Sequence, residues 1–107
     1  MVKQYDIFLI DLDPAKEHEM KKTSPCIIIS PDELNKFLAT VIIAPLTSAE
    51  KNYKFRANIT FQNKKGAIVL DQLRTVDKSG LIKQIGHLDN STIVKIKNIL
   101  KEMLVDE

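Results

Sequence analysis

The chain has one cysteine, three glycines and no long apolar run. Cys26 cannot form an internal disulfide, and it stands in the apolar run 25–29, where we expect a small core residue. No stretch approaches the roughly 18 apolar residues that a membrane span needs, and residues 1–6 are too polar for a secretory signal. None of the glycines has a phosphate-cradling spacing, which argues against a Rossmann or P-loop nucleotide site. These absences predict a cytosolic protein without a nucleotide cofactor.

The composition is that of an ordinary globular protein. The 107 residues are 44% hydrophobic and 28% charged, which suits a single domain over residues 1–107 with one modest core. Sixteen basic and 14 acidic residues leave a formal charge of +2. Lysines concentrate at 16–22 and 51–65, in stretches that we expect to be loops at least in part. This distribution favours a polyanionic partner more than the small net charge does.

Most of the chain has the pattern of short β-strands. β-Branched and apolar runs, some of them alternating with polar residues, predict strands at 5–12, from Ser24 onward, and at 40–45, 55–61, 67–70 and 74–77. Residues 81–85 are expected to pair back onto the strand 74–77 across a turn at 77–80, and residues 63–66 form another turn. Residues 15–23 lack apolar periodicity and predict a long exposed loop.

Two helices are expected. Ser30, Pro31 and Glu33 have the spacing of a capping box before one short helical turn. A longer C-terminal helix begins at a cap formed by Asp89 or Ser91. Its apolar stripe is Ile93, Ile96, Leu100, Met103 and Leu104. The predicted fold is mainly β with α, an α+β domain: a small SH3-like β-barrel with a short helix and an amphipathic C-terminal helix.

Five blocks of the sequence resemble the MazF/PemK family of toxin endoribonucleases, the mRNA interferases of type II toxin-antitoxin systems. The blocks are DIFLIDLDP at 6–14, HE at 18–19, SPDELN at 30–35, APLTS at 44–48 and DQLRTVD at 71–77. The resemblance implies a homodimer that cleaves single-stranded mRNA at short sequences, with the ribose 2′-hydroxyl as nucleophile and without a metal or other cofactor. It also implies a cognate antitoxin whose acidic, disordered tail covers the basic groove.

RNA that supplies its own nucleophile needs a base for the 2′-proton, an acid for the leaving oxygen, and donors or cations for the phosphorane. The resemblance makes Glu19 and His18 the candidates for proton transfer, and Thr47 and Ser48 the candidates for phosphate contact. Asp71 matches an aspartate with a catalytic or RNA-binding role in some relatives. The structural alternatives are a solvated charged loop for His18 and Glu19 and an ordinary turn for Thr47 and Ser48.

Further candidates for RNA contact are basic, aromatic or polar. They are Lys16, Lys21, Lys22, Ser24, Lys54, Phe55, Arg56, Gln72 and Arg74. Lys54, Phe55 and Arg56 are expected together on the strand that follows the loop after Ser48. Phe55 has a core position as its alternative interpretation. For Arg74 and Asp77 we favour an internal ion pair beneath the site.

Two positions depart from the family pattern. Ser24 precedes Pro25 where most members carry an arginine that serves as a principal catalytic cation, and Met20 stands where relatives often have glutamine. Loss of a preorganised donor to a transition state costs roughly 10² to 10³ in rate. The sequence therefore leaves three outcomes open: a slow enzyme, an inactive one, or one in which Lys21, Lys22 or Arg56 replaces the missing charge.

Two alternatives to a ribonuclease follow. A related family on the same barrel, typified by CcdB, poisons DNA gyrase through its C-terminal helix, but the end of this helix, 103–107, has no aromatic anchor. The other alternative is an RNA-binding module that lost catalysis with its arginine. The loops 15–23 and 49–54 correspond to the variable loops that set RNA specificity in the family, and the recognised bases do not follow from the sequence.

Overall fold

The computed structural model describes residues 1–11, 23–48 and 53–106. The elements in chain order are β1 (Asp6–Asp11), β2 (Thr23–Ile28), α1 (Asp32–Phe37), β3 (Thr40–Thr47), β4 (Arg56–Phe61), β5 (Lys64–Val69), the 3₁₀ turn η1 (Leu70–Gln72), β6 (Arg74–Asp77), the 3₁₀ turn η2 (Lys78–Gly80), β7 (Leu81–His87) and α2 (Asn90–Leu104). None of the helices in these ranges is both long and apolar enough to cross a membrane.

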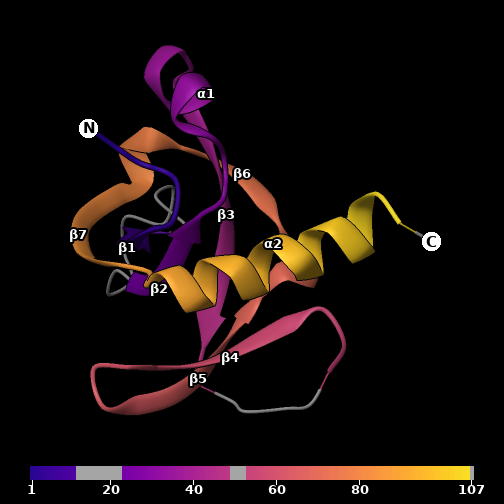
Figure 1. Cartoon of the computed structure of the whole chain (residues 1–107). Helices are drawn as coiled ribbons and strands as arrows, with labels where there is room; N and C mark the ends of the chain where they lie inside the picture. Colours follow the sequence, from indigo (N-terminus) through magenta and orange to yellow (C-terminus); the bar gives the residue numbers. More distant parts are fainter. Residues whose placement is uncertain (12–22, 49–52, 107) are drawn as a thin grey trace.

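The strands form one curled antiparallel sheet in the order β4-β5-β3-β2-β1-β7, with β6 added to β3. β3 serves two neighbours on one edge, because its first half pairs with β6 and its last residues pair with β5. Figure 1 shows α2 crossing the strands between α1 at one end and the β4–β5 hairpin at the other. The sheet is a half-barrel whose edge strands are β4 and β7, and the predicted α+β barrel class is confirmed.

Both faces of the central strands are buried, in two separate clusters. Ile7 and Ile27 pack with Ile68 and with Ile96 of α2 in the larger cluster. Their neighbours along β1, β2 and β3 point the other way and build the smaller cluster, which consists of Ile10, Cys26, Ile28, Val41 and Ile43. Alternation along a strand sends successive side chains to opposite faces, so the short apolar runs supply both clusters. Cys26 is a buried core residue as predicted.

The pairing of β7 differs from the prediction. Residues 81–85 were expected to pair back onto 74–77, but β7 pairs with β1, where Phe8 is opposite Gln84 and Leu9 is opposite Lys83. β6 instead pairs with β3. The 3₁₀ turn Lys78–Gly80 redirects the chain between the two strands without reversing it into a hairpin, and the other edge of β1 accepts β7.

The turn between β4 and β5 also differs from the prediction. Gln62 and Asn63 have φ angles of 50° and 62°, so both lie in the left-handed region. Two such residues between paired strands make the tight turn whose twist matches that of the strands. Phe61 pairs with Lys64, and Lys64, Lys65 and Gly66 therefore belong to β5 instead of the turn expected at 63–66.

The capping box predicted at α1 is wrong. Pro31 is the N-cap residue and no side chain caps the helix. Ser30 is buried, and its hydroxyl donates to Asn35 Oδ1 at 2.5 Å and accepts from the backbone N–H of Ile42 at 3.0 Å. The Ser30 side chain thus connects α1 to β3. Its hydroxyl is engaged by Asn35 and Ile42 and does not cap the helix.

The amphipathic C-terminal helix is confirmed. Asp89 is its N-cap, and Oδ1 of Asp89 accepts from the backbone N–H of Thr92 at 2.8 Å. Ile96 is fully buried, and Ile93, Leu100 and Met103 pack against the larger cluster. Ile99 joins them, whereas Leu104 at the predicted end of the stripe is 65% exposed. Leu104 is the last residue of α2, and Val105 after it is exposed as well.

Candidate functional site

Three of the predicted hydroxyl-bearing residues lie at one end of β2 and β3. Cys26 of β2 pairs with Pro45 of β3, so that Ser24, two residues before Cys26, and Thr47, two residues after Pro45, lie at the same end of the two strands. Thr47 is the last residue of β3, which is two residues longer than predicted, and Ser48 follows it on the surface. The structure therefore has Ser24, Thr47 and Ser48 at one end of the sheet, and their contact with RNA stays a prediction.

Gly66 permits an unusually close approach of β5 to Thr47. A Cβ atom at Gly66 would lie 2.4 Å from the backbone oxygen of Thr47, inside the distance that real Cβ atoms keep. The φ angle of Gly66 is not positive, so the requirement is one of space and not of backbone conformation. The next residue, Ala67, pairs with Thr47. The absence of a side chain at Gly66 thus fixes how closely Thr47 sits against β5.

Residues 12–22 lie outside the described parts of the chain, and with them the candidates His18, Glu19, Lys16, Lys21 and Lys22. The two ends of that segment are described, since Asp11 pairs with Thr23 and Ile10 pairs with Ser24. The segment therefore leaves and rejoins the sheet at the end where Ser24 and Thr47 lie. Contact between Glu19 and a phosphate held at Thr47 stays a prediction.

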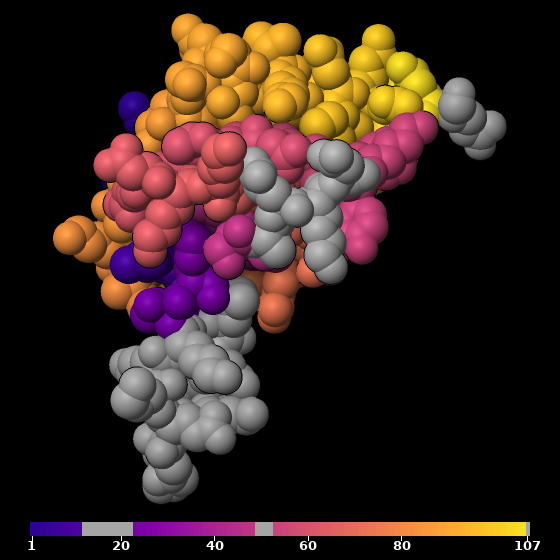
Figure 2. Space-filling view, turned by 90° about the horizontal axis from the view of Figure 1, so that it is seen from below, coloured from indigo at the N-terminus to yellow at the C-terminus, as the bar shows by residue number. Residues whose placement is uncertain are grey.

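A pocket of about 350 Å³ opens next to Thr47 and Ser48. Its wall is mainly apolar, and polar side chains stand at its hydroxyl-bearing end and on the β4–β5 hairpin. The residues that line it are Leu9, Pro25, Leu46, Thr47, Ser48, Ile59, Phe61, Gln62, Lys64, Lys65, Gly66 and Ile85. Figure 2 shows β2, the end of β3 and the β4–β5 hairpin next to one another on this face. Of these residues, Thr47 and Ser48 alone were predicted as site residues from the sequence. The lysine cluster at 51–65 was the one signal for the others.

Arg56 and Asp71 form an ion pair beside this region. Arg56 Nε lies 3.1 Å from Asp71 Oδ1, Nη2 lies 3.4 Å from Oδ2, and the guanidinium stacks 4.6 Å from the centre of the Tyr53 ring. The hydrogen bond from Arg56 holds the pKa of the Asp71 carboxyl below its usual range. An aspartate held ionised in this way is a poor proton donor at neutral pH. The structure therefore favours Asp71 as a partner of Arg56 over Asp71 as a general acid.

Arg56 is near Thr47 but not beside it. Arg56 pairs with Val69 of β5, two residues along from Ala67, the partner of Thr47. β5 lies between β4 and β3, so Arg56 is two strand spacings away from Thr47 and is also displaced by two residues along the strand direction. The backbones of Arg56 and Thr47 are therefore roughly 12 Å apart. The guanidinium that was considered as a replacement for the family arginine is therefore engaged by Asp71 at one side of the site.

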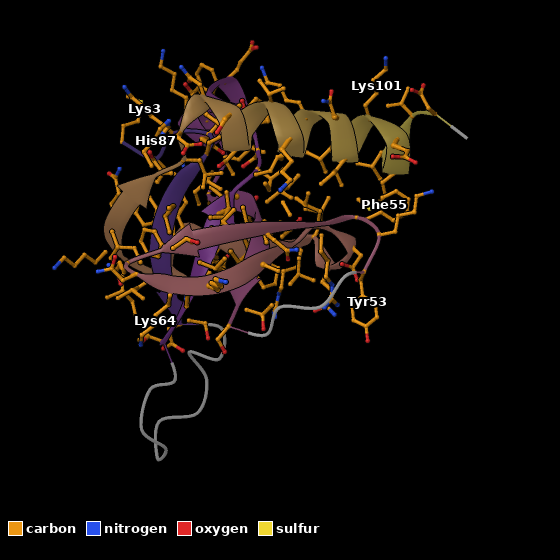
Figure 3. The ribbon with its side chains drawn as sticks, turned by 60° about the horizontal axis from the view of Figure 1, so that its bottom comes forward. Lys3, Tyr53, Phe55, Lys64, His87 and Lys101 are labelled. Carbon is orange, nitrogen blue, oxygen red and sulfur yellow. The ribbon has the colours of Figure 1, made fainter. Side chains whose placement is uncertain are left out.

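Lys54 and Phe55 precede β4 and do not lie on it, contrary to the prediction. Phe55 has a φ angle of 67°, which a strand residue does not adopt. Lys54 Nζ is 3.1 Å from Glu102 Oε1 of α2 and 5.3 Å from the centre of the Phe55 ring. The left-handed residue turns the chain before β4 and directs this lysine toward α2, away from the pocket lining. Figure 3 shows Phe55 beside the C-terminal part of α2.

Gln72 and Arg74 are exposed, on η1 and β6. The ion pair favoured for Arg74 and Asp77 is absent from the described residues, although both are described. Arg74 is opposite Ile43 and Asp77 is opposite Thr40, and residues three apart on a strand point to opposite faces. Arg74 is therefore available for RNA contact on an exposed strand, outside the pocket.

A second polar cluster, which the sequence analysis did not single out, lies at the other end of β1. Asp6 is buried, and its carboxylate accepts from the backbone N–H of Lys3 at 2.9 Å and from Gln84 Nε2 at 3.2 Å. His87 Nδ1 is 2.8 Å from Asp6 Oδ1. Asp6 and Asp11 are the first and last residues of β1 and lie roughly 17 Å apart, so this cluster is not part of the candidate site. Figure 3 shows His87 beside Lys3, across the molecule from Lys64.

Among the residues that the structure describes, no three histidine, cysteine, aspartate or glutamate side chains are grouped so that they could hold a metal ion. Cleavage without a metal stays a prediction, because residues 12–22 and 49–52 lie outside the described ranges.

Known proteins resemble the chain in sequence over nearly its whole length. Residues 3–104 match the family described as PemK-like, MazF-like toxin of type II toxin-antitoxin system. The Endoribonuclease MazF of Staphylococcus epidermidis is 31% identical over 106 residues, which cover 94% of this chain and 88% of that protein.

Solved structures share the fold. A mycobacterial endoribonuclease in complex with its cognate antitoxin superposes with a TM-score of 0.82 at 20% identity and covers 97% of this chain and 95% of that one. A MazE-MazF complex from Deinococcus radiodurans gives a TM-score of 0.79 at 16% identity over 99% and 97% of the two chains. The family match, the curated relative and the half-barrel with its C-terminal helix agree, and the chain belongs to the PemK-like, MazF-like toxins of type II toxin-antitoxin systems.

Proposed function

We propose that the chain is a metal-independent endoribonuclease that cleaves single-stranded mRNA through attack of a ribose 2′-hydroxyl on the adjacent phosphate. The observation that carries the proposal is the placement of Ser24, Thr47 and both ends of the segment 12–22 at the same end of the sheet. Thr47 and Ser48 supply two hydroxyls for the phosphate oxygens, and the segment between Asp11 and Thr23 carries His18 and Glu19.

The chemistry divides among these groups. One of His18 and Glu19 removes the 2′-proton and the other protonates the leaving 5′-oxygen. Thr47 and Ser48 donate to the phosphorane oxygens, where charge develops in the transition state. Asp71 acts here as the partner of Arg56, because a carboxyl with a lowered pKa is a poor proton donor and a weaker base than a free carboxylate.

The charge that the family arginine supplies has to come from elsewhere, since Ser24 is neutral. Arg56 is a weaker candidate than the sequence suggested, because its guanidinium is held by Asp71 in a nearly buried position. Lys64 and Lys65 line the pocket together with Thr47 and offer cations at the site itself. Lys22 and Lys21, one and two residues before Thr23, remain alternatives.

The partners follow from family membership. We propose that two copies of the chain form a homodimer and that a cognate antitoxin with an acidic, disordered tail neutralises the toxin by binding over its basic surface. The mycobacterial relative in complex with its cognate antitoxin and the Deinococcus MazE-MazF complex support such a partner. Messenger RNA as the substrate makes the cytoplasm the place of action.

The test is incubation of the purified protein with a long RNA in the presence of a chelator. We expect fragments with 2′,3′-cyclic phosphate ends, and we expect Glu19→Gln and Thr47→Val to slow cleavage by roughly 10² to 10³. Phe37→Leu, on the exposed surface of α1, is the control and should cleave like the wild type. RNA that is bound but left intact would support the RNA-binding module, and an inert RNA together with gyrase inhibition would support the CcdB-like alternative.

A further inference from the structure

The pocket next to Thr47 lies where the sheet fails to close. β4 and β7 are the first and last strands of the order β4-β5-β3-β2-β1-β7, and the pocket receives Ile59 and Phe61 from β4 and Ile85 from β7. A Cβ atom at Gly86 of β7 would lie 3.2 Å from Phe61 Cε1 and 3.6 Å from Cζ, so the edge of the Phe61 ring rests on β7. Side-chain contact thus replaces strand pairing at this seam, and the half-buried ring is held in place.

The pocket wall changes in character along its length. Its seam side is apolar, with Leu9, Ile59 and Ile85 around Phe61. Its other side reaches the hydroxyls of Thr47 and Ser48. Such a combination of an apolar wall with a few polar groups, in about 350 Å³, is within the range of small-ligand pockets, roughly 300 to 1,000 Å³.

The polar groups on the hairpin are an amide and two ammonium groups. Gln62, in the tight turn, can both donate and accept hydrogen bonds, as recognition of a base edge requires. Lys64 and Lys65 are exposed and border the same pocket. No acidic side chain is among the residues that line the pocket within the described ranges. The occupant that fits is therefore flat, apolar on its faces, polar at its edge and attached to an anion.

We propose that this pocket holds one nucleobase of the RNA, the base next to the phosphate that Thr47 and Ser48 contact. The proposal rests on the function proposed above and adds a subsite to it. The Phe61 ring packs against the base, Gln62 contacts the base edge, and Lys64 and Lys65 neutralise the neighbouring phosphates. The pocket thereby sets base preference at one position beside the cut, in addition to the loops from which specificity was expected.

The experiment measures coupling between the ring and one base. Cut sites are first mapped on a long RNA, and short oligonucleotides that span one site are then made with a single abasic position on either side of the cut. Cleavage rates are measured on these, and equilibrium binding is measured on copies with a 2′-deoxy sugar at the cut. In the wild type one abasic position should weaken binding roughly tenfold, the range found for loss of a stacked base. In Phe61→Leu the same abasic position should weaken binding less than threefold, because the ring is already absent.

Phe61→Leu keeps an apolar side chain at the seam, and Phe37→Leu on the exposed surface of α1 is the matched control that should retain the full tenfold effect. Gln62→Ala is a second probe, which leaves the core untouched and should relax the preference for one base at the same position. If the wild type cuts RNA but no abasic position is less harmful in Phe61→Leu than in the wild type, the pocket proposal is wrong and the ribonuclease stands. If RNA is bound but not cut, the proposed cleavage is wrong, and the abasic position is moved along a bound oligonucleotide instead. A position that is less harmful in Phe61→Leu than in the wild type would then support the pocket, and the lack of such a position would contradict it. If RNA is neither bound nor cut, both are wrong.

Discussion

Substitution of Gly66 by alanine should disturb stability and catalysis through a single contact. The added Cβ would lie 2.4 Å from the Thr47 backbone oxygen, whereas carbon and oxygen in proteins approach to roughly 3.3–3.6 Å. The neighbour is backbone and cannot rotate away, so β3 and β5 must separate by about 1 Å at this point. Overpacking of this kind costs about 1–3 kcal/mol, which lowers the melting temperature of a domain of this size by roughly 5–20 °C.

The same displacement moves the Thr47 hydroxyl relative to a bound phosphate. A misplacement of about 1 Å at a reacting centre costs on the order of 10²-fold in rate. We therefore expect Gly66→Ala to melt lower than the wild type and, at a temperature where it is fully folded, to lose about 10²-fold in single-turnover cleavage of RNA. Calorimetry and a quenched-flow cleavage assay measure the two effects separately.

Gly86→Ala is the matched control for stability. It adds the same methyl group, but the group meets Phe61 Cε1 at 3.2 Å and Ile7 Cδ1 at 3.4 Å, and side-chain atoms can move where a carbonyl cannot. Its melting temperature should fall less than that of Gly66→Ala. A Gly66→Ala protein that melts and cleaves like the wild type would refute the reasoning, as would a loss of stability no greater than that of Gly86→Ala.

Three further predictions concern ionisable groups. Asp71→Asn should lower the free energy of unfolding by less than about 1 kcal/mol at pH 7, because the pair with Arg56 is partly exposed. The pKa of the Asp71 carboxyl is lower in the folded protein than in the unfolded chain, where it is roughly 3.9. The contribution of Asp71 to the free energy of unfolding is therefore present above the unfolded-state pKa and is lost as the pH falls through the folded-state pKa. Urea titrations of the wild type and of Asp71→Asn should then give the same free energy of unfolding in acid. Asp6→Ala removes a buried acceptor next to His87 and should cost about 1–3 kcal/mol in the same titrations, with the cleavage rate unchanged; a variant as stable as the wild type would contradict this. Burial raises the pKa of the Cys26 thiol to about 12, so a thiol reagent at pH 8 should modify it only in denaturant, and rapid labelling of the folded protein would show that the site is open.

The parts of the fold that follow from local pattern could be predicted from the sequence. The stripe around Ile96 and the Asp89 cap define α2 because periodicity and capping act within a few residues. The strand at 74–77 has the predicted bounds, and the buried Cys26 follows from its apolar run. The turn at Gln62 and Asn63 was placed one residue late, because asparagine before a lysine pair gives no sign of which residues adopt left-handed backbone.

The pairing of elements that are distant in the chain could not be predicted from the sequence. Nothing in residues 81–85 specifies β1 over β6 as a partner, and β6 is the strand that precedes β7 in the chain. Ser30 has every local feature of a helix cap, yet the buried amide of Asn35 and the N–H of Ile42 compete for its hydroxyl. In each case the decisive group lies on an element distant in the chain.

Part of the site could likewise be predicted from the sequence and part could not. Thr47 and Ser48 were identified through the resemblance, and the register of β2 and β3 brings Ser24 to them. The pocket could not be identified, because it joins Leu9, Phe61 and Ile85 from three separate strands at a seam that exists only in the folded sheet. The engagement of Arg56 by Asp71 was also missed, since the charge of a side chain does not reveal which partner it will meet.

Among the described residues, two pairs join β3 to the β4–β5 hairpin, Leu46 with Ile68 and Thr47 with Ala67. The same short ladder positions the hydroxyl that is to meet the phosphate and supports one wall of the pocket. Short ladders at the end of a sheet are where local opening costs least free energy. An opening of this ladder that widens the pocket for an incoming strand of RNA therefore also loosens Thr47. Entry of the substrate and positioning of the Thr47 hydroxyl thus require opposite movements of the same ladder.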